Sequence, residues 1–385
     1  MKKLSTLTLL TTAATSCLTH ADDKIAIQYM QYQESDDRIG VNYLAATIEK
    51  DFGVDHTLKV DYSYDSISGA SPSWDTVSGG SPSVDLDDPV NESTNQAILS
   101  GGGQQQDYIW RNIEMTDRRD SGGAQLTWRH GERRNELTVG ANISAESDYN
   151  SLELSSSYLA YLDELKNTSL SVGASYQGNE VNSIDNGWKN VTIINTQVGI
   201  THILNHQTLL KADLFAFQDK GELSNPYQRI VRQYNGQYYL AKDSRPERRQ
   251  AAGLKLGHIY AFNDHLTLHS DYRYYQDDWG INSHTLAANA YITINEHWRI
   301  APAVRYYKQG SADFYKAQDG DDPYFEITGY GSSDQRLSDF DSWTGQFGIT
   351  YLHQSDLEFN LTTTAQQQSY GLDLYWAMLG MVYKY

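Results

Sequence analysis

The chain is poor in the residue types that mark disulfide-rich, nucleic-acid-binding or helical membrane proteins. It has one cysteine and seven prolines in 385 residues, and its 30 Lys and Arg are outnumbered by 49 Asp and Glu. A formal net charge of −19 argues against a nucleic-acid partner, because phosphate backbones are recognised through excess Lys and Arg. No later window holds about 18 consecutive apolar residues, so the sequence predicts no transmembrane helix.

The N-terminal segment MKKLSTLTLLTTAATSCLTHA has two lysines, a moderately apolar centre and a small residue at its end. This arrangement predicts a secretory signal peptide, residues 1–21, which is excluded from fold reasoning. Removing its two lysines changes the net charge from −19 to −21. Cys17 precedes the cut, so the mature chain 22–385 would have no disulfide and no cysteine–metal site. Lipoprotein processing at Cys17 is the alternative, although Ala14 stands where that signal has a branched aliphatic residue.

Tyrosine, glycine and alternating hydrophobicity are abundant. The chain has 29 Tyr, 29 Gly and 8 Trp. In residues 137–143, Leu, Val, Ala and Ile alternate with Thr, Gly and Asn, and residues 170–176 and 357–362 repeat the pattern. Period-two alternation is typical of half-exposed β-strands. A membrane-spanning strand shows lipid only every second residue, so a chain of low mean hydropathy can still belong in a membrane.

Sixteen segments with this pattern follow one another along the chain. They are 24–33, 38–51, 56–67, 120–130, 135–146, 151–163, 168–179, 188–203, 207–219, 249–262, 265–277, 281–294, 298–310, 341–353, 356–368 and 371–385. Short polar turns such as FGVDH, HGERRN and INEH all fall on one side, and the long connections 68–119, 220–248 and 311–340 fall on the other. Outer-membrane barrels have this asymmetry, with short periplasmic turns and long extracellular loops. The sequence therefore predicts an all-β fold, a transmembrane antiparallel up-and-down β-barrel of about 16 strands (14–16).

The final segment supports an outer-membrane location in a Gram-negative bacterium. It ends in an alternating apolar and aromatic face with Tyr383 and Tyr385, similar to the terminal signal that the barrel-assembly machinery reads. That machinery, outer-membrane lipid and lipopolysaccharide are the expected partners. Aromatic residues near segment ends, Trp128 and Trp376 among them, suit interfacial girdles. A soluble, secreted all-β protein is the competing interpretation, but it does not account for the asymmetry of the connections.

Two features distinguish the long loops. Residues 68–77 and 78–87 repeat a Ser-, Gly- and Pro-rich decapeptide, which predicts two successive tight turns, either folded into the lumen or lying on the surface. Acidic residues crowd the first and third loops. They are Asp75, Asp85, Asp87, Asp88, Glu92, Asp107, Glu114 and Asp117, then Asp313, Asp319, Asp321, Asp322, Glu326, Asp334, Asp339 and Asp341. Carboxylates suit divalent cations, but DGDDP (319–323) lacks the spacing of a calcium loop. No specific metal site is assigned, and solvated charge is the alternative.

Alternation also directs charged side chains toward the lumen. The predicted lumen-facing charges are Lys59, Asp61, Arg129, Lys211, Asp213, Lys255, Asp271, Arg273, Arg299, Arg305 and Glu358. Charges lining a pore would tune ion selectivity, and sixteen strands leave an aqueous lumen unless loops fill it. The alternative is a wall of mutually paired charges that braces the barrel and passes nothing. The residues alone do not separate the two.

The middle loop interleaves arginine with tyrosine. Tyr227, Arg229, Arg232 and Arg245 are candidate ligand-binding residues, because guanidinium groups bind carboxylate or phosphate through paired hydrogen bonds. In the alternative, these arginines pair with the acidic loops and hold the extracellular mouth together.

Catalysis has little support in the sequence. Ser81 lacks a nucleophile-elbow pattern, and His269 and His284 fit barrel-wall positions. No enzymatic activity and no cofactor are expected. The sequence favours a channel or transport component for small polar solutes. The alternative is a loop-plugged binding or structural barrel that acts through a surface or periplasmic partner.

Several long stretches resemble one known family. They are DSISGASPSWDTVSGGSP (65–82), NPYQRIVR (225–232), RPERR (245–249), YRYYQDDWGINSHT (272–285), PAVRYYKQGSADFY (302–315) and SDQRLSDF (333–340). They are similar to the Gram-negative outer-membrane proteins catalogued as domain of unknown function 3570. The stretch SGGGQQQDY (100–108) lies in an insertion longer than the family pattern. The resemblance covers most of the mature chain and implies a barrel in the outer membrane, without an established activity.

Overall fold

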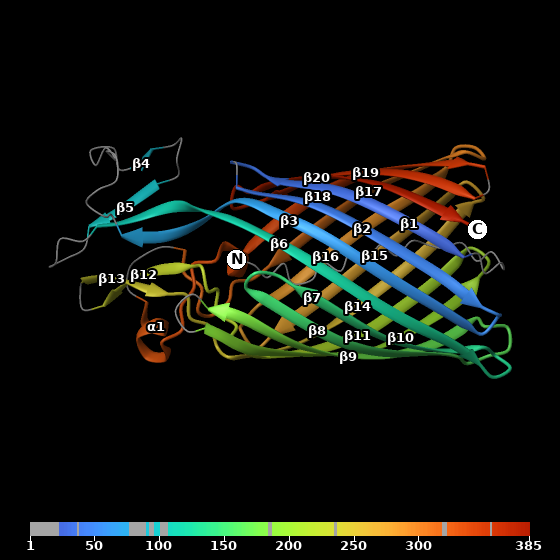
Figure 1. Ribbon diagram of the computed structural model, residues 1–385, viewed down its shortest axis with the longest axis horizontal. Helices are drawn as coiled ribbons and strands as arrows, with labels where there is room; N and C mark the ends of the chain where they lie inside the picture. The colour runs from blue at the N-terminus through green and yellow to red at the C-terminus, as the bar shows by residue number, and fades with distance from the viewer. Residues whose placement is uncertain are drawn as a thin grey trace.

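Sixteen strands of the computed structural model close into one antiparallel barrel (Figure 1). The structure describes residues 23–36, 38–76, 90–91, 96–100, 107–183, 187–234, 237–317, 322–354 and 356–385. The barrel strands are β1 (Lys24–Glu34), β2 (Ile39–Phe52), β3 (His56–Thr76), β6 (Asp107–His130), β7 (Asn135–Ala145), β8 (Tyr149–Tyr161), β9 (Thr168–Ser183), β10 (Gly187–Asn205), β11 (Thr208–Gly221), β14 (Arg248–Asn263), β15 (Leu266–Asp277), β16 (Asn282–Thr293), β17 (Trp298–Gln309), β18 (Phe340–His353), β19 (Leu357–Gln368) and β20 (Asp373–Lys384). The predicted fold class is confirmed, and each predicted segment corresponds to one of these strands.

The first and last strands pair and close the sheet. β1 is antiparallel to both β2 and β20, with Ile25 opposite Ile48 on one side and opposite Tyr383 on the other. Hydrocarbon offers no partner to a free N–H or C=O, so a sheet can span it only when its two edges meet. Seven short turns lie at the end of the barrel that holds the C-terminus, here called the turn end. The long connections leave from the opposite end, called the loop end.

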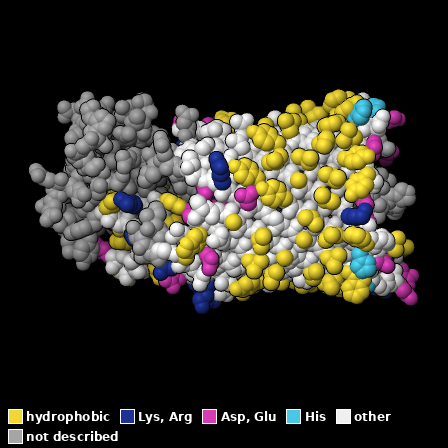
Figure 2. All heavy atoms as spheres, viewed as in Figure 1, with side chains coloured by type: hydrophobic (Ala, Val, Ile, Leu, Met, Phe, Trp, Pro, Cys, Tyr) yellow, Lys and Arg dark blue, Asp and Glu magenta, His cyan; other side chains and the backbone are white. Residues whose placement is uncertain are grey.

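The outer surface carries an apolar band over the part of the barrel next to the turn end (Figure 2). Exposed side chains such as Ile143, Leu154 and Leu214 recur at every second position, as a lipid-facing surface requires. Trp128 lies among them, in the predicted girdle position. Trp376 does not. It lies on the inner face, because position 376 has the opposite parity to the exposed Tyr375. It is in register with Tyr32, and the centroids of the two tilted rings are 6.2 Å apart.

Leu154 and its neighbour Ser155 test this placement in the membrane. Leu154 is 52% exposed near the middle of β8, whereas Ser155 occupies the opposite face. Leu154→Arg is expected to destabilise the barrel by about 2–4 kcal/mol, the cost of a cation near the bilayer midplane. Ser155→Arg, which directs the same charge into the lumen, should cost less. The measurement is reversible urea unfolding in lipid vesicles. Equal losses for the two variants would contradict a lipid-facing β8.

The first long connection is partly strand. β3 continues to Thr76 and β6 begins at Asp107, with Gly69 opposite Met115 and Thr76 opposite Tyr108. The tight turn predicted for residues 68–77 is therefore wrong, because pairing with β6 outweighs the local turn preference of Ser-Gly and Ser-Pro. β2 begins at Ile39, opposite Gly69, so beyond Gly69 the strand β3 extends past β2 and has an edge on that side, where a proline is tolerated. The second copy, 78–87, lies outside the described residues.

The other elements belong to the loop end. β4 (Val90–Asn91) and β5 (Gln96–Ser100) adjoin the extension of β6, and β12 (Arg229–Tyr234) pairs with β13 (Gln237–Lys242) as a separate hairpin. Helix α1 (Pro323–Thr328) and the 3₁₀ turn η1 (Gln335–Leu337) lie between β17 and β18. Asp322 caps α1 by accepting the Phe325 N–H, and Gly329 ends the helix with a φ of 73°, a conformation that suits glycine. None of the described helices has the length and apolar character needed to cross a bilayer.

Candidate functional site: a charged lumen wall beneath a loop cap

Strand alternation places the predicted lumen-facing charges on the inner face. On β3 the exposed Val60 and Tyr62 flank Asp61, and on β11 the exposed Leu210 and Leu214 lie on either side of Lys211 and Asp213. By this criterion the inner positions are those of Lys59, Asp61, Arg129, Lys211, Asp213, Lys255, Asp271, Arg273, Arg299, Arg305 and Glu358. They do not form one cluster, because they come from seven strands around the barrel.

Some of these charges pair with one another. Lys211 Nζ lies 3.5 Å from an Asp213 oxygen, and Lys255 Nζ lies 3.2 Å from an Asp271 oxygen. Arg129 donates to the Thr57 hydroxyl at 2.8 Å and lies 3.7 Å from Glu136. The Lys211–Asp213 pair lies within β11, whereas the contacts of Lys255 and Arg129 join neighbouring strands, as the wall of paired charges would. Exposed ion pairs of this kind contribute little stability each.

Arg273 and Arg305 form no ion pair in the described part of the chain, and each lies over an aromatic ring. The Arg273 guanidinium lies 4.6 Å from the centroid of the Phe215 ring, and the Arg305 guanidinium lies 5.3 Å from that of Tyr307. A guanidinium over an aromatic face is held by the ring quadrupole while its charge is not neutralised. Arg273 and Arg305 are therefore inner-face cations without a carboxylate.

The wall on β8–β10 is polar and uncharged over most of its length. The Gln177 amide donates to Ser151 at 2.9 Å, and the Asn195 amide donates to Ser175 at 3.1 Å. Side chains that satisfy one another in this way leave a hydrophilic surface facing the lumen. The cations on β14–β17 belong to a separate part of the wall, because β11 lies between β10 and β14.

Two long connections close over the mouth at the loop end. They are residues 222–247, between β11 and β14, and residues 310–339, between β17 and β18, and together they are called the cap. Arg232 is its central residue and is 1% exposed. Its Nε lies 2.8 Å from an Asp322 oxygen, and its other nitrogens donate to the Ser332 carbonyl at 3.1 Å and the Ser333 hydroxyl at 3.2 Å.

A second buried network surrounds Asp334. Arg245 bonds Asp243 at 2.7 Å and Asp334 at 3.0 Å, and Arg336 lies 2.6 Å from the same Asp334 oxygen. Burial by itself would raise the pKa of Asp334. The charges and hydrogen bonds of Arg336 and Arg245 instead hold that pKa well below its usual range. The carboxylate therefore stays ionised, and the two connections are joined by charge-assisted hydrogen bonds.

Arg232 and Arg245, two of the predicted ligand-binding residues, are paired within the cap. Both guanidinium groups are buried and occupied by carboxylates of the cap, as in the alternative interpretation of paired loops. The Tyr227 hydroxyl donates to Asp148, in the turn between β7 and β8, and so joins the cap to the far rim. Arg229 is exposed on β12. The guanidinium donors of Arg232 and Arg245 are used in ion pairs because Asp322 and Asp334 are buried beside them.

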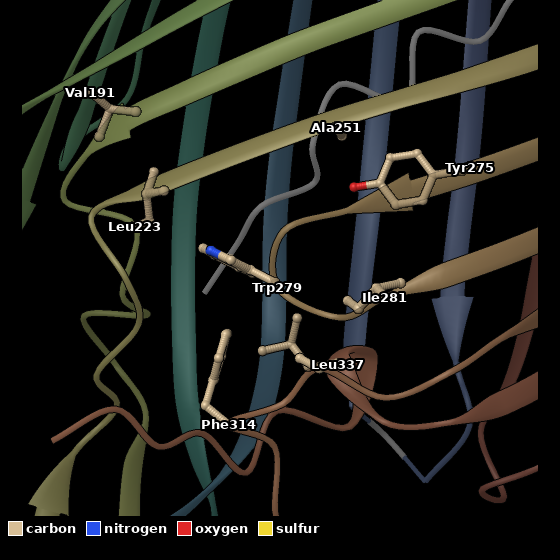
Figure 3. Packing of buried hydrophobic residues seen from close by; sticks show 9 residues of the cluster. Val191, Leu223, Ala251, Tyr275, Trp279, Ile281, Phe314 and Leu337 are labelled. Carbon is tan, nitrogen blue, oxygen red and sulfur yellow. The ribbon is translucent and has the colours of Figure 1, made fainter. Parts of the chain in front are cut away.

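An apolar cluster anchors the cap to the inner wall (Figure 3). Trp279, in the turn between β15 and β16, contacts Phe314 edge to face at 5.1 Å between ring centroids. The cluster also includes Leu223 and Leu337 from the cap, and Tyr275 from the barrel wall. Sequence reasoning missed it. The available signal was large apolar residues in otherwise polar loops, as in the triplets DWG (278–280) and ADF (312–314).

The described residues include one group of carboxylates that could hold a metal ion. Ligand atoms of Asp117, Glu146 and Asp148 lie within 4.8 Å of one another. Asp117 was one of the predicted acidic residues of the first loop, and the other two come from the turn between β7 and β8. Oxygen ligands of this kind suit a hard cation. In the third loop, Asp322 forms an ion pair with Arg232, and Asp334 forms one with Arg245. Asp319 and Asp321 lie outside the described residues.

Fold and site together define a class: a closed sixteen-stranded barrel of the outer-membrane type, with a polar lumen wall and a capped mouth. The family model described as "Protein of unknown function (DUF3570)" matches residues 3–192 and 185–376. The chain therefore belongs to this family, as the resemblance implied. No curated protein matches the chain significantly.

The solved structures to which the chain is similar are distant in sequence. The chain is similar to a bacterial polysaccharide outer membrane secretin, with a TM-score of 0.53, 10% identity, and coverage of 96% of this chain and 100% of that one. The siderophore receptor PirA from Pseudomonas aeruginosa has a TM-score of 0.43 and 7% identity, with coverage of 94% of this chain and 80% of that one. The CymD monoaromatic hydrocarbon channel has a TM-score of 0.41 and 10% identity, with coverage of 94% of this chain and 88% of that one. At such identities, the similarity to the secretin concerns the fold alone.

Proposed function

We propose that this protein is a transport barrel of the Gram-negative outer membrane that passes small polar solutes under the control of its cap. One observation carries the proposal: a barrel lined by polar side chains lies beneath a cap whose two connections are joined to each other by ion pairs. A sixteen-stranded barrel is wide enough for an aqueous lumen. Ion pairs between loops can be exchanged for water more readily than a continuous apolar core. Outer-membrane lipid, lipopolysaccharide and the barrel-assembly machinery are the proposed partners.

A second candidate function is a binding or structural barrel that stays closed. The cluster of Trp279, Phe314 and Leu337 favours it, because it fixes the cap to the wall by apolar burial as well as by charge. In this case the cap would be a permanent plug and a surface for a partner.

Planar bilayer recording of the purified protein separates the two functions. The transport proposal expects stepwise conductance, with brief closures as the cap moves. The control is protein that has been denatured by heat, which no longer migrates as a compact barrel on gels. A compact, membrane-inserted barrel that never conducts would reject transport and support the closed barrel.

A further inference from the structure

We propose that Arg273 and Arg305 form a binding site for small oxyanions on the lumen wall, just beneath the cap. The two residues stand two strands apart. Arg273 on β15 is in register with Thr285 on β16, and Arg305 on β17 is in register with Ala287 on β16. Neighbouring strands are about 4.8 Å apart, so two long side chains can converge over the small residues between them.

The two cations are close and are not neutralised by the protein. They flank the same strand, β16, two register positions apart, and in the described residues neither forms an ion pair. The two inner carboxylates on the same strand as Arg273 are engaged elsewhere. Asp271 lies 3.2 Å from Lys255, and Asp277 lies 2.6 Å from Arg249 and accepts the Tyr275 hydroxyl. Two like charges on one wall repel each other, and a bound anion would remove that repulsion.

The aromatic contacts leave the binding edges of the guanidinium groups available. Phe215 and Tyr275 lie against the Arg273 guanidinium, and Tyr307 lies against that of Arg305. An aromatic ring holds a guanidinium through its quadrupole and does not use the N–H donors of the group. A guanidinium binds carboxylate or phosphate through two parallel hydrogen bonds. The shared chemistry of the ligand is therefore an oxyanion.

Polar groups beside Arg305 add to the site. Thr344 on β18 is in register with Arg305, and its hydroxyl oxygen is buried without a hydrogen-bond partner in the described part of the structure. A buried polar atom without a partner is costly, and a bound ligand would remove the cost. Thr285, opposite Arg273, offers another hydroxyl. These neighbours favour a ligand that carries hydrogen-bonding groups besides its negative charge.

The cap lies directly above this site. Tyr275 contacts the Arg273 guanidinium and also belongs to the apolar cluster that holds Trp279 and Phe314. An anion bound at Arg273 and Arg305 would therefore lie next to the anchor of the cap. The inference rests on the proposed transport function for its biological meaning, since it names the class of solute. Binding itself does not require that the barrel conducts.

Titration calorimetry on the detergent-solubilised, full-length barrel tests the site, with inorganic phosphate and acetate as separate probes in low-chloride buffer. We expect saturable binding of at least one probe, and the stronger probe identifies phosphate or carboxylate as the preferred group. Arg305→Gln should weaken binding at least tenfold, and Arg273→Gln/Arg305→Gln should abolish it. Arg305→Lys keeps the charge without the paired donors and should have an intermediate effect.

Lys211→Gln is the matched control, since it removes one cation from the same wall but from an existing ion pair. It should change the affinity less than twofold. Heat-modifiable gel migration checks that each variant is folded. Absence of saturable binding to the wild type overturns the site, as does an equal loss in Lys211→Gln. A barrel that binds the anion but never conducts would reject the transport proposal and support the anion site. A barrel that conducts but binds neither probe would support transport and reject the anion site.

Discussion

Arg232→Met is expected to loosen the cap and expose it to protease. The substitution keeps the apolar stem but leaves the Asp322 carboxylate, 6% exposed, without its guanidinium. Removing one partner of a buried ion pair costs about 3–5 kcal/mol, because the other charge stays buried and uncompensated. The strain should appear in the cap rather than in the barrel, since Arg232 has its contacts with residues 322–333.

Limited digestion with proteinase K, followed by mapping of the cuts, measures this effect. We expect cuts within 222–247 and 310–339 at least tenfold faster than in the wild type, with the barrel still resistant. In planar bilayers the same variant should have a larger open fraction. Arg229→Met is the matched control, because Arg229 is exposed on the same strand β12.

A double substitution separates loss of charge balance from loss of packing. Arg232→Met/Asp322→Asn removes both charges, and asparagine still caps α1. Replacing a whole buried pair is often neutral, whereas breaking one is costly. The double variant should therefore regain most of the protease resistance. Digestion of Arg232→Met at the wild-type rate would contradict the central role given to this pair.

The barrel could be predicted from the sequence because each strand carries its own evidence. Lipid on one face and water on the other impose an alternation of apolar and polar residues within a single segment, as in 137–143. The strand can therefore be predicted without knowing its partner strands. The errors have the same origin. A position near a strand end predicts Trp376 in the outer girdle, but its parity is opposite to that of the exposed Tyr375, so it lies on the inner face. Residues 68–77 looked like turns because their partner strand was not visible locally.

The cap could not be predicted, because its contacts join residues far apart in the sequence. Arg232 and Asp322 are separated by 90 positions, and Arg245 and Asp334 by 89. The composition of these loops showed that opposite charges were present, but it did not show which would meet or at what depth. Burial decides the outcome: an exposed arginine can bind a ligand, whereas the same residue, when buried beside a carboxylate, is committed to the fold.

Gly253→Val is expected to prevent most of the chain from forming a stable barrel. Gly253 lies on β14 between Phe215 and Tyr275, and a Cβ there would be 2.2 Å from the Phe215 ring and 2.4 Å from the Tyr274 carbonyl oxygen. The ring could move aside. The Tyr274 carbonyl cannot move aside, because it belongs to the backbone of β15, which is paired with a strand on each side. Overpacking of this kind costs about 1–3 kcal/mol or more.

Refolding into lipid vesicles measures the loss, as the fraction that reaches the compact, heat-modifiable form and as the urea midpoint. Gly345→Val is the matched control, because nothing lies within 4 Å of a Cβ at that position on β18. It should fold as well as the wild type. Phe215→Ala in the Gly253→Val background relieves the ring contact but not the carbonyl contact, so only partial recovery is expected. Since Phe215 also supports the Arg273 guanidinium, the rescued barrel should bind oxyanions more weakly than the wild type. Full recovery would show that the ring, and not the β15 backbone, sets the requirement for glycine.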